Sequence, residues 1–478
     1  MTSDLPPPGP EAASSDEPSP PRRRRSRPNY TARRVAVGSA LLAVIAVAAI
    51  AVMVVSSGDD DQDVAIEPGW DTLVEIVRAT GEVIVLDGDG DEIERLDGAG
   101  RVTDVHVRDD RLALVGADQV VLRGLDPDDE PVAIEIEPGA SVVRHLSNRS
   151  FTLFVTPDVG GEIVVIDGTD GSVTRIGSRA GQNQPLLLAE TLRTDRDATR
   201  FAVGDGRNFQ TILVDVDPDV EPTFFPGVPM AVGDDLVVTS TNVGRSAELG
   251  FFDADGERRA LVPTERPVAG VLDGARFVYV TEDGILLEAS PTESEPTELA
   301  DLGLRGIDRV SPAFDGRRLI VTGTRQIVVV DLDGVIVHES ERAEGDETGV
   351  AEIRPWHTWR CLAIPGDVDA DADADTADVG LIIDLDAGET VAEIPSGTIE
   401  AVTTDGCGVH VRTATGDAIA TRSGRYDAGD AVRSIVLSPD GTAAIVVDGS
   451  GTAELITIDD SRRLDIGTRR GLLTFAQR

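Results

Sequence analysis

The chain has few of the residues on which common catalytic and nucleotide-binding motifs depend. It has no lysine, because all 43 of its Lys and Arg residues are arginine, and this excludes a phosphate-binding Gly-rich loop with its lysine. It has no Gly-x-Ser-x-Gly turn, and its five histidines (106, 145, 338, 357 and 410) form no short metal-binding pair. The sequence therefore predicts no catalytic residue, no resident cofactor and no metal ligand.

Long helical periodicity is also absent from residue 71 onwards. A unit of about 41 residues recurs there instead, which is typical of repeat architectures whose units cannot bury their apolar faces alone. Each copy contains a short apolar run, a turn rich in Asp and Gly, and a second short run. Clear copies of this pattern lie at Ile84–Leu96, Val164–Ile176, Val328–Ser340 and Leu455–Ile466.

The last copy shows the complete unit, with four short strands joined by tight turns. The Pro-Asp-Gly and Asp-Gly turns supply the backbone angles that a hairpin needs, and Val, Ile and Thr dominate between them. The predicted strands of this copy are Val432–Leu437, Thr442–Val447, Thr452–Ile458 and Arg462–Ile466.

Sequential four-stranded units of this length predict an all-β fold, a β-propeller over residues 71–478. Ten units can be traced, but the units around Asp283 and Gly416 are weak, and one ring usually has four to eight blades. We therefore expect seven or eight blades, with Gly471–Arg478 closing the ring against the first blade. A string of β-sandwich domains is the alternative, but it would need a period about twice as long.

Two segments carry a family resemblance. The turn Ser438–Gly441 with the TAAIVVD that follows it, and SPAFDGRRLIVTG at Ser311–Gly323, resemble the WD40-like and YVTN-type bacterial propellers. The resemblance spans roughly residues 71–478 and is carried by turn chemistry, so it implies a fold. Because such propellers host many unrelated functions, it implies no particular activity.

An uncharged stretch of 21 residues, Val35–Val55, precedes the repeats. It predicts a transmembrane helix over residues 35–56. Arginines before it and aspartates after it place residues 1–34, a Pro- and Arg-rich disordered tail, in the cytoplasm. The acidic linker 57–70 and the propeller are then extracytoplasmic, in a single-pass protein of the cell membrane. A cleaved signal peptide is the alternative, although this stretch is longer than a usual signal core.

The charge of the chain is strongly acidic, at −43. The first 34 residues carry seven arginines against four acidic residues, so the remainder carries about −46. Such a surface repels phosphates and excludes nucleic acid as a default partner. It favours cationic partners or divalent ions, or it simply secures solubility.

Two cysteines, Cys361 and Cys407, are the only ones in the chain. Alignment of the units places each at the start of the second strand of its unit. Equivalent positions in neighbouring units of an extracytoplasmic protein predict a disulfide between adjacent blades. Two separate buried thiols are the alternative, because a bridge requires the Cα atoms to lie within about 7 Å.

Two acidic segments have spacings that suggest calcium. Asp87, Asp89 and Asp91 alternate as in the first half of an EF-hand loop, but Glu92 occupies the position of the required glycine. Asp367–Asp378 alternates Asp with small residues. Turn aspartates also serve local hydrogen bonding alone, which is the simpler interpretation of both segments.

One dense aromatic cluster stands out in a chain with 4% aromatic residues. Trp356, His357 and Trp359 are a candidate stacking platform for a sugar ring or for the side chain of a partner. Packing of the tryptophans between blades is the simpler interpretation of this cluster.

Taken with the anchor and the missing catalytic motifs, the repeats predict a non-catalytic binding or scaffold module of the cell envelope. Its partner would be a protein or a cell-wall polymer. The alternative is an enzyme, a metal-dependent lactonase or hydrolase with carboxylates around a central ion. A sensor that reports to the cytoplasm is a third hypothesis, but the tail contains no recognisable output module.

Overall fold

The computed structural model describes residues 70–477 with gaps at 147–150, 157–162, 177–186, 197–198, 218–219, 244–245, 342–358, 366–378, 404, 414, 423, 430–431, 458–460 and 465–470. All of them belong to the second of two compact units, Val64–Arg478. The predicted tail (1–34), the transmembrane helix (35–56) and nearly all of the linker (57–70) lie outside the described residues. Within the described part, no helix has the length and apolar character needed to cross a membrane.

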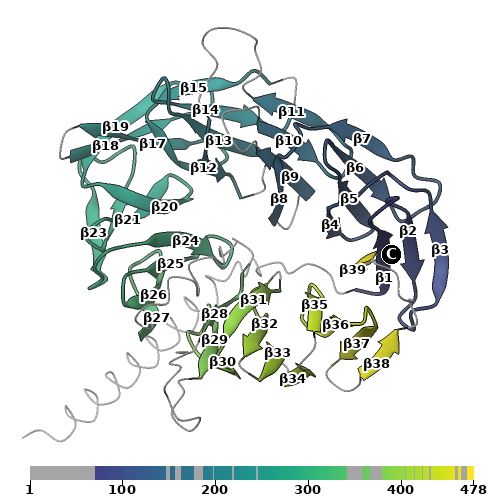
Figure 1. The fold of residues 1–478 in the computed structure, drawn as a ribbon. Helices are drawn as coiled ribbons and strands as arrows, with labels where there is room; N and C mark the ends of the chain where they lie inside the picture. Colours follow the sequence, from purple (N-terminus) through teal and green to yellow (C-terminus); the bar gives the residue numbers. More distant parts are fainter. Residues whose placement is uncertain are drawn as a thin grey trace, which may run out of the picture. The chain divides into compact units, whose positions relative to one another are not determined.

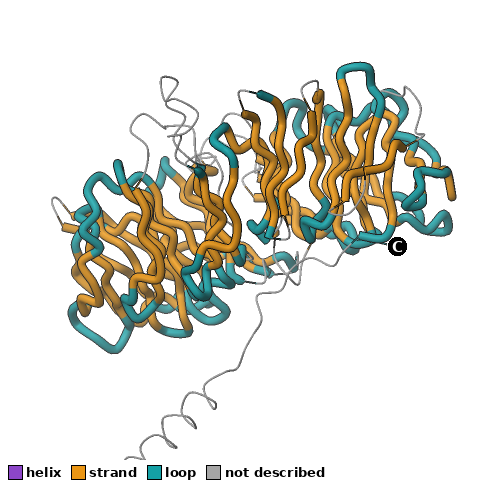
Figure 2. The backbone as a smooth tube through the Cα atoms, turned by 90° about the horizontal axis from the view of Figure 1, so that it is seen from below, coloured by secondary structure: helices purple, strands orange, loops and turns teal. Residues whose placement is uncertain are grey.

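The described residues form 39 strands arranged in ten antiparallel sheets, joined by loops and turns (Figure 2). Nine sheets have four strands. The remaining sheet has three described strands, and residues 342–358, which precede it, are not described. The sheets follow one another around a ring (Figure 1). This is a β-propeller of ten blades, numbered here from the N-terminus.

The strands of blades 1 to 5 have these bounds: blade 1, β1 (Thr72–Val77), β2 (Val83–Leu86), β3 (Glu92–Leu96) and β39 (Gly471–Ala476); blade 2, β4 (Asp104–Arg108), β5 (Arg111–Val115), β6 (Gln119–Gly124) and β7 (Val132–Glu135); blade 3, β8 (Ser141–Leu146), β9 (Phe151–Thr156), β10 (Ile163–Asp167) and β11 (Val173–Ile176); blade 4, β12 (Leu187–Thr194), β13 (Arg200–Asp205), β14 (Gln210–Asp215) and β15 (Thr223–Pro226); blade 5, β16 (Val228–Val232), β17 (Val237–Val243), β18 (Ser246–Phe252) and β19 (Arg258–Thr264).

Those of blades 6 to 10 are: blade 6, β20 (Pro267–Asp273), β21 (Arg276–Thr281), β22 (Ile285–Ala289) and β23 (Thr297–Asp301); blade 7, β24 (Arg309–Ala313), β25 (Arg318–Thr322), β26 (Gln326–Asp331) and β27 (Ile336–Glu341); blade 8, β28 (Cys361–Ile364), β29 (Gly380–Asp384) and β30 (Thr390–Ile394); blade 9, β31 (Thr398–Val402), β32 (Gly408–Thr413), β33 (Gly416–Thr421) and β34 (Gly424–Gly429); blade 10, β35 (Val432–Leu437), β36 (Ala443–Asp448), β37 (Ala453–Thr457) and β38 (Ser461–Leu464).

The position of a strand in its blade explains its sequence. The two middle strands are covered on both faces by neighbouring blades, so they are continuous apolar runs such as VIVL in β2 and QIVVVD in β26. The fourth strand lies at the rim and is partly exposed, so it contains charged residues, as in β27, IVHESE. The middle strands therefore supply most of the core.

The core consists of ten hydrophobic clusters, one between each pair of neighbouring blades. The cluster between blades 10 and 1, for example, joins Ile445 and Leu455 to Leu73 and Ile84. A single blade is too thin to bury both of its faces, so each blade depends on its two neighbours.

The first and last described strands close the ring. Strand β39 pairs antiparallel with β1 along its whole length, from Thr72 opposite Ala476 to Val77 opposite Gly471. Blade 1 thus combines three strands from the start of the described chain with one from its end. The predicted closing role of residues 471–478 is realised by this strand.

The expected number of blades, seven or eight, is wrong, because the structure has ten. The two units that looked weak are complete four-stranded sheets. Asp283 lies in the turn between β21 and β22 of blade 6, and Gly416 begins β33 of blade 9. Their third strands end without the aspartate that marks other blades, although their middle strands are equally apolar.

Candidate functional sites

Cys361 and Cys407 are joined in a disulfide between blades 8 and 9. Cys361 is the first residue of β28, the first described strand of blade 8, and Cys407 directly precedes β32, the second strand of blade 9. The Cα atoms of the two cysteines are 4.9 Å apart, within the range of protein disulfides. The backbone N–H groups of Arg360 and Cys361 both donate to the carbonyl of Asp405. These contacts hold the two strand starts together.

The three residues of the predicted aromatic platform are not seen together. Trp356 and His357 lie outside the described residues. Trp359 is 3% exposed and packs in the hydrophobic cluster between blades 7 and 8. Its carbonyl accepts the N–H of Phe314 at 2.8 Å. The ring of Trp359 therefore packs between blades, which is the simpler interpretation of its sequence context.

The carboxylate of Asp87, in the first of the two acidic segments, accepts hydrogen bonds from its own turn. Oδ1 of Asp87 accepts the backbone N–H groups of Asp89 at 2.8 Å and Asp91 at 2.9 Å. The same contact, from a strand-ending aspartate to the N–H two residues on, recurs at Asp126, Asp167, Asp215, Asp331, Asp384 and Asp448. It fixes the turn by a local hydrogen bond.

No group of three or more His, Cys, Asp or Glu side chains that could hold a metal ion occurs among the described residues. The second acidic segment, residues 367–378, lies outside them.

The histidines that the structure describes lie in different blades. Burial lowers the pKa of His106, on the first strand of blade 2, and the nearby carboxylate of Asp104 opposes this effect. His410, on β32, is 5% exposed, and its Nε2 lies 2.7 Å from Oδ1 of the equally buried Asp417. Nothing in the sequence pairs these two residues. They meet because β32 and β33 are adjacent strands of one hairpin.

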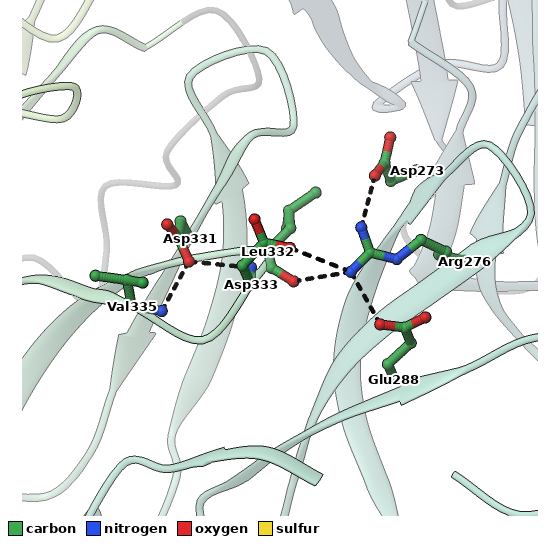
Figure 3. A network of polar contacts seen from close by, with 7 residues as sticks. All are labelled: Asp273, Arg276, Glu288, Asp331, Leu332, Asp333 and Val335. Carbon is green, nitrogen blue, oxygen red and sulfur yellow. Dashed lines mark hydrogen bonds and ion pairs between the residues drawn. The ribbon is translucent and has the colours of Figure 1, made fainter. Parts of the chain in front are cut away.

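An arginine at the start of a second strand forms the polar network of Figure 3. Arg276, the first residue of β21, contacts Glu288 at 2.9 Å and Asp273 at 3.3 Å within blade 6. It also reaches Asp333 at 3.4 Å and the carbonyl of Leu332, in the last turn of blade 7. The hydrogen bond that Arg276 donates to the carboxylate of Glu288 raises the pKa of Arg276. The network ties two neighbouring blades together near the rim.

Arg318 repeats this arrangement one blade further on. Its Nε donates to the carbonyl of Leu385 in blade 8 at 2.9 Å, and its Nη2 reaches the carboxylate of Asp386 at 3.4 Å. Arg200 of blade 4 reaches the carbonyl of Asp234 in blade 5. The sequence signal for this set is an arginine immediately before an apolar middle strand, as in RFVYVT and RLIVT.

One ion pair joins blades that are not neighbours. Arg196 follows β12 of blade 4, and its Nε donates to Oδ1 of Asp315 in blade 7 at 2.8 Å. Asp315 is 8% exposed. It follows Phe314 in a turn where both residues have positive φ, 50° for Phe314 and 56° for Asp315. The guanidinium of Arg317 lies 4.3 Å from the centre of the Phe314 ring. The ion pair therefore connects blade 4 to blade 7 directly, in addition to the contacts between adjacent blades.

Comparisons with known proteins add little about function. No family model matches the chain, and no curated protein matches its sequence. Similar solved structures include the dihydro-heme d1 dehydrogenase NirN in complex with DHE, with 16% identity, a TM-score of 0.37, and coverage of 69% of this chain and 74% of that one. Another is BamB from Moraxella catarrhalis, with 14% identity, a TM-score of 0.30, and coverage of 68% and 95%. These low scores carry no argument about activity.

Proposed function

We propose that the chain is a single-pass membrane protein whose ten-bladed propeller lies outside the cytoplasm and acts as a non-catalytic binding or scaffold module of the cell envelope. The observation that carries the location is the disulfide between Cys361 and Cys407. Stable disulfides form in oxidising compartments and are rare in the cytosol. The apolar stretch 35–56, with arginines before it and aspartates after it, supplies the anchor.

Binding rather than chemistry is supported by how the described acidic residues are used. The strand-ending aspartates accept backbone N–H groups of their own turns, and the carboxylates around Arg276 are engaged in the network between blades 6 and 7. Such contacts make a rigid scaffold whose surface loops are held in place, as a binding module requires. The partner would be a protein or a cell-wall polymer such as peptidoglycan, because the net charge disfavours nucleic acid.

Topology in cells producing the full-length chain tests the location. We expect the protein in the membrane fraction, resistant to alkaline carbonate, with its propeller digested by protease added to spheroplasts. A freely secreted propeller would show that residues 35–56 are a cleaved leader. A propeller protected until the membrane is broken would place it in the cytoplasm.

Co-sedimentation and co-purification of the full-length protein test the binding role. We expect it to sediment with isolated peptidoglycan sacculi or to co-purify with a defined envelope protein. Calcium should leave its melting temperature unchanged. If neither interaction occurred and calcium raised the melting temperature, the metal-dependent hydrolase would become the better hypothesis.

A further inference from the structure

The rim strand of blade 4, β15, differs from the other fourth strands. Each of the other nine blades has at least one charged residue in its outermost described strand, such as Glu135 in β7 or Glu393 in β30. Strand β15 reads Thr-Phe-Phe-Pro. Charged side chains on an edge strand discourage other chains from docking there. This protection is missing from β15.

Exposed apolar side chains gather at this strand. Along the chain from Phe224, exposed residues alternate with buried ones, so that Phe224, Pro226 and Val228 are exposed while Phe225 and Gly227 are buried. Phe224 is 57% exposed and Val228 39%. The carbonyl of Phe209, which is 77% exposed, accepts the N–H of Gly227 at 3.1 Å. We call Phe209, Phe224, Pro226 and Val228 the β15 patch.

The turn that presents Phe209 is built around a buried carboxylate. Asp205 is 1% exposed and accepts hydrogen bonds from the N–H of Arg207 at 3.0 Å and from Nδ2 of Asn208 at 2.5 Å. Phe209 itself has a φ of 53°, a left-handed conformation that is strained for a residue other than glycine. The turn therefore holds a bulky aromatic side chain in solvent by a fixed conformation. Rigid aromatic anchors of this kind are common at binding hot spots.

The charge of the chain indicates what covers the patch. A second copy would also carry a net charge of −43, so two copies repel each other at long range. A basic protein would instead be attracted to the acidic propeller and could bury the apolar side chains on arrival. We propose that the β15 patch is the docking surface for a basic partner protein. This inference rests on the proposed binding function and names the surface and the partner class.

Site-specific photo-crosslinking in cells producing the full-length protein tests the proposal. The photoreactive residue replaces Glu221, which is exposed and three residues before Phe224, and in a control it replaces Val335, which is 59% exposed on blade 7. We expect position 221, and not position 335, to crosslink to one protein of net positive charge. The crosslink should disappear in Phe209→Ala and Phe224→Ala variants.

Reconstitution with that crosslinked protein, once purified, completes the test. We expect Phe209→Ala to weaken binding by at least about tenfold and Val335→Ala to leave it unchanged, with affinity falling as salt rises. The side chains of Phe209 and Val335 are both exposed, so neither substitution should change the melting temperature. Equal melting temperatures of the two variants would exclude misfolding as the cause of weaker binding. A crosslink between two copies, to an acidic protein or to glycan would overturn the proposal.

The outcome at the control position separates this proposal from the wider one. Crosslinking at position 335 but not at position 221 would show that the β15 patch is not the docking surface, and it would remain consistent with the proposed binding function. Absence of crosslinks at both positions, together with no co-sedimentation or co-purification, would overturn both.

Discussion

Tyr279 shows how one buried side chain makes stability depend on pH. It is fully buried on β21, its ring stacks on Phe277, and its hydroxyl lies 2.5 Å from Oγ1 of Thr264. Burial raises the pKa of Tyr279 to about 12. An unfolded tyrosine has a pKa of about 10, so between pH 10 and 12 the unfolded chain loses this proton and the folded chain keeps it. Folding stability should therefore fall as the pH rises through this window.

Tyr279→Phe tests this prediction. At pH 7 the variant should be less stable by about 1 kcal/mol because it lacks the hydrogen bond to Thr264. Above pH 10 the deficit should shrink and then reverse, since phenylalanine does not ionise. Denaturant unfolding at pH 7 and above pH 10 measures both values. Thr264→Val is the control, because it removes the hydrogen bond and keeps the phenol, so no reversal is expected. A pH-independent deficit in Tyr279→Phe would contradict the argument.

At Gly406, beside the disulfide, the backbone lies very close to that of Cys361. It has a φ of 77°, and a Cβ there would lie 2.3 Å from the carbonyl oxygen of Cys361 and 3.0 Å from the ring of Trp359. Gly451 has a φ of 86° and open space around it, so it is a matched control. Gly451→Ala should cost about 1 kcal/mol through backbone strain alone. Gly406→Ala should cost at least about 2 kcal/mol more, because the backbone atoms it meets cannot yield. Equal losses in denaturant unfolding would show that the close approach is absent.

Residue-level prediction from the sequence succeeded where chemistry is local. The turn aspartates were expected from Asp-Gly patterns, and the oxygen of Asp87 bonds within five residues of chain. The contact from Arg276 to Asp333 and the ion pair of Arg196 with Asp315 depend on which blades come together. That information is set by tertiary packing, and no local pattern carries it.

At the scale of elements, the bridge between β28 and the start of β32 joins two blades across a sequence separation of 46 residues. A loop of that length predicts about 4 kcal/mol of stabilisation in the chain-entropy model. The double variant Cys361→Ala/Cys407→Ala should lower the midpoint of denaturant unfolding accordingly. The wild-type protein unfolded and refolded under reductant is the matched control and should show nearly the same midpoint. An unchanged midpoint would mean that native strain cancels the entropic gain.

The strands of each blade could be predicted from the sequence, but the number of blades could not. The four-strand unit was predicted correctly because hairpin turns and β-branched runs are local signals. The unit of β20 to β23 gives a weak sequence signal because its third strand ends at Ala289 and is followed by Ser290 instead of Asp. Its Phe277 and Val280 nevertheless fill the clusters shared with blades 5 and 7. Packing of middle strands therefore defines a blade, and the turn aspartate is optional.

At the scale of the whole molecule, the ring is stable only if it is closed. Without β39, blade 1 would keep three strands, and the cluster between blades 10 and 1 would lose Phe475, which is 2% exposed and packs edge-on against Trp70 at 4.9 Å. Each blade needs a neighbour on both faces, so one open interface exposes apolar surface on two blades. The loss of stability should then extend to blades other than blade 1.

Removal of residues 471–478 should therefore lower the melting temperature, broaden the transition and promote aggregation, as thermal unfolding and gel filtration would measure. Removal of residues 2–9, which lie in the predicted disordered tail, is the matched control and should change neither. A synthetic peptide of residues 471–478 should restore the sharp transition, because it can pair with β1 in the register of Thr72 with Ala476. A truncated protein that stayed monomeric and unfolded as sharply as the full chain would show that nine intact interfaces suffice. Ring closure would then contribute little to the stability of a propeller this large.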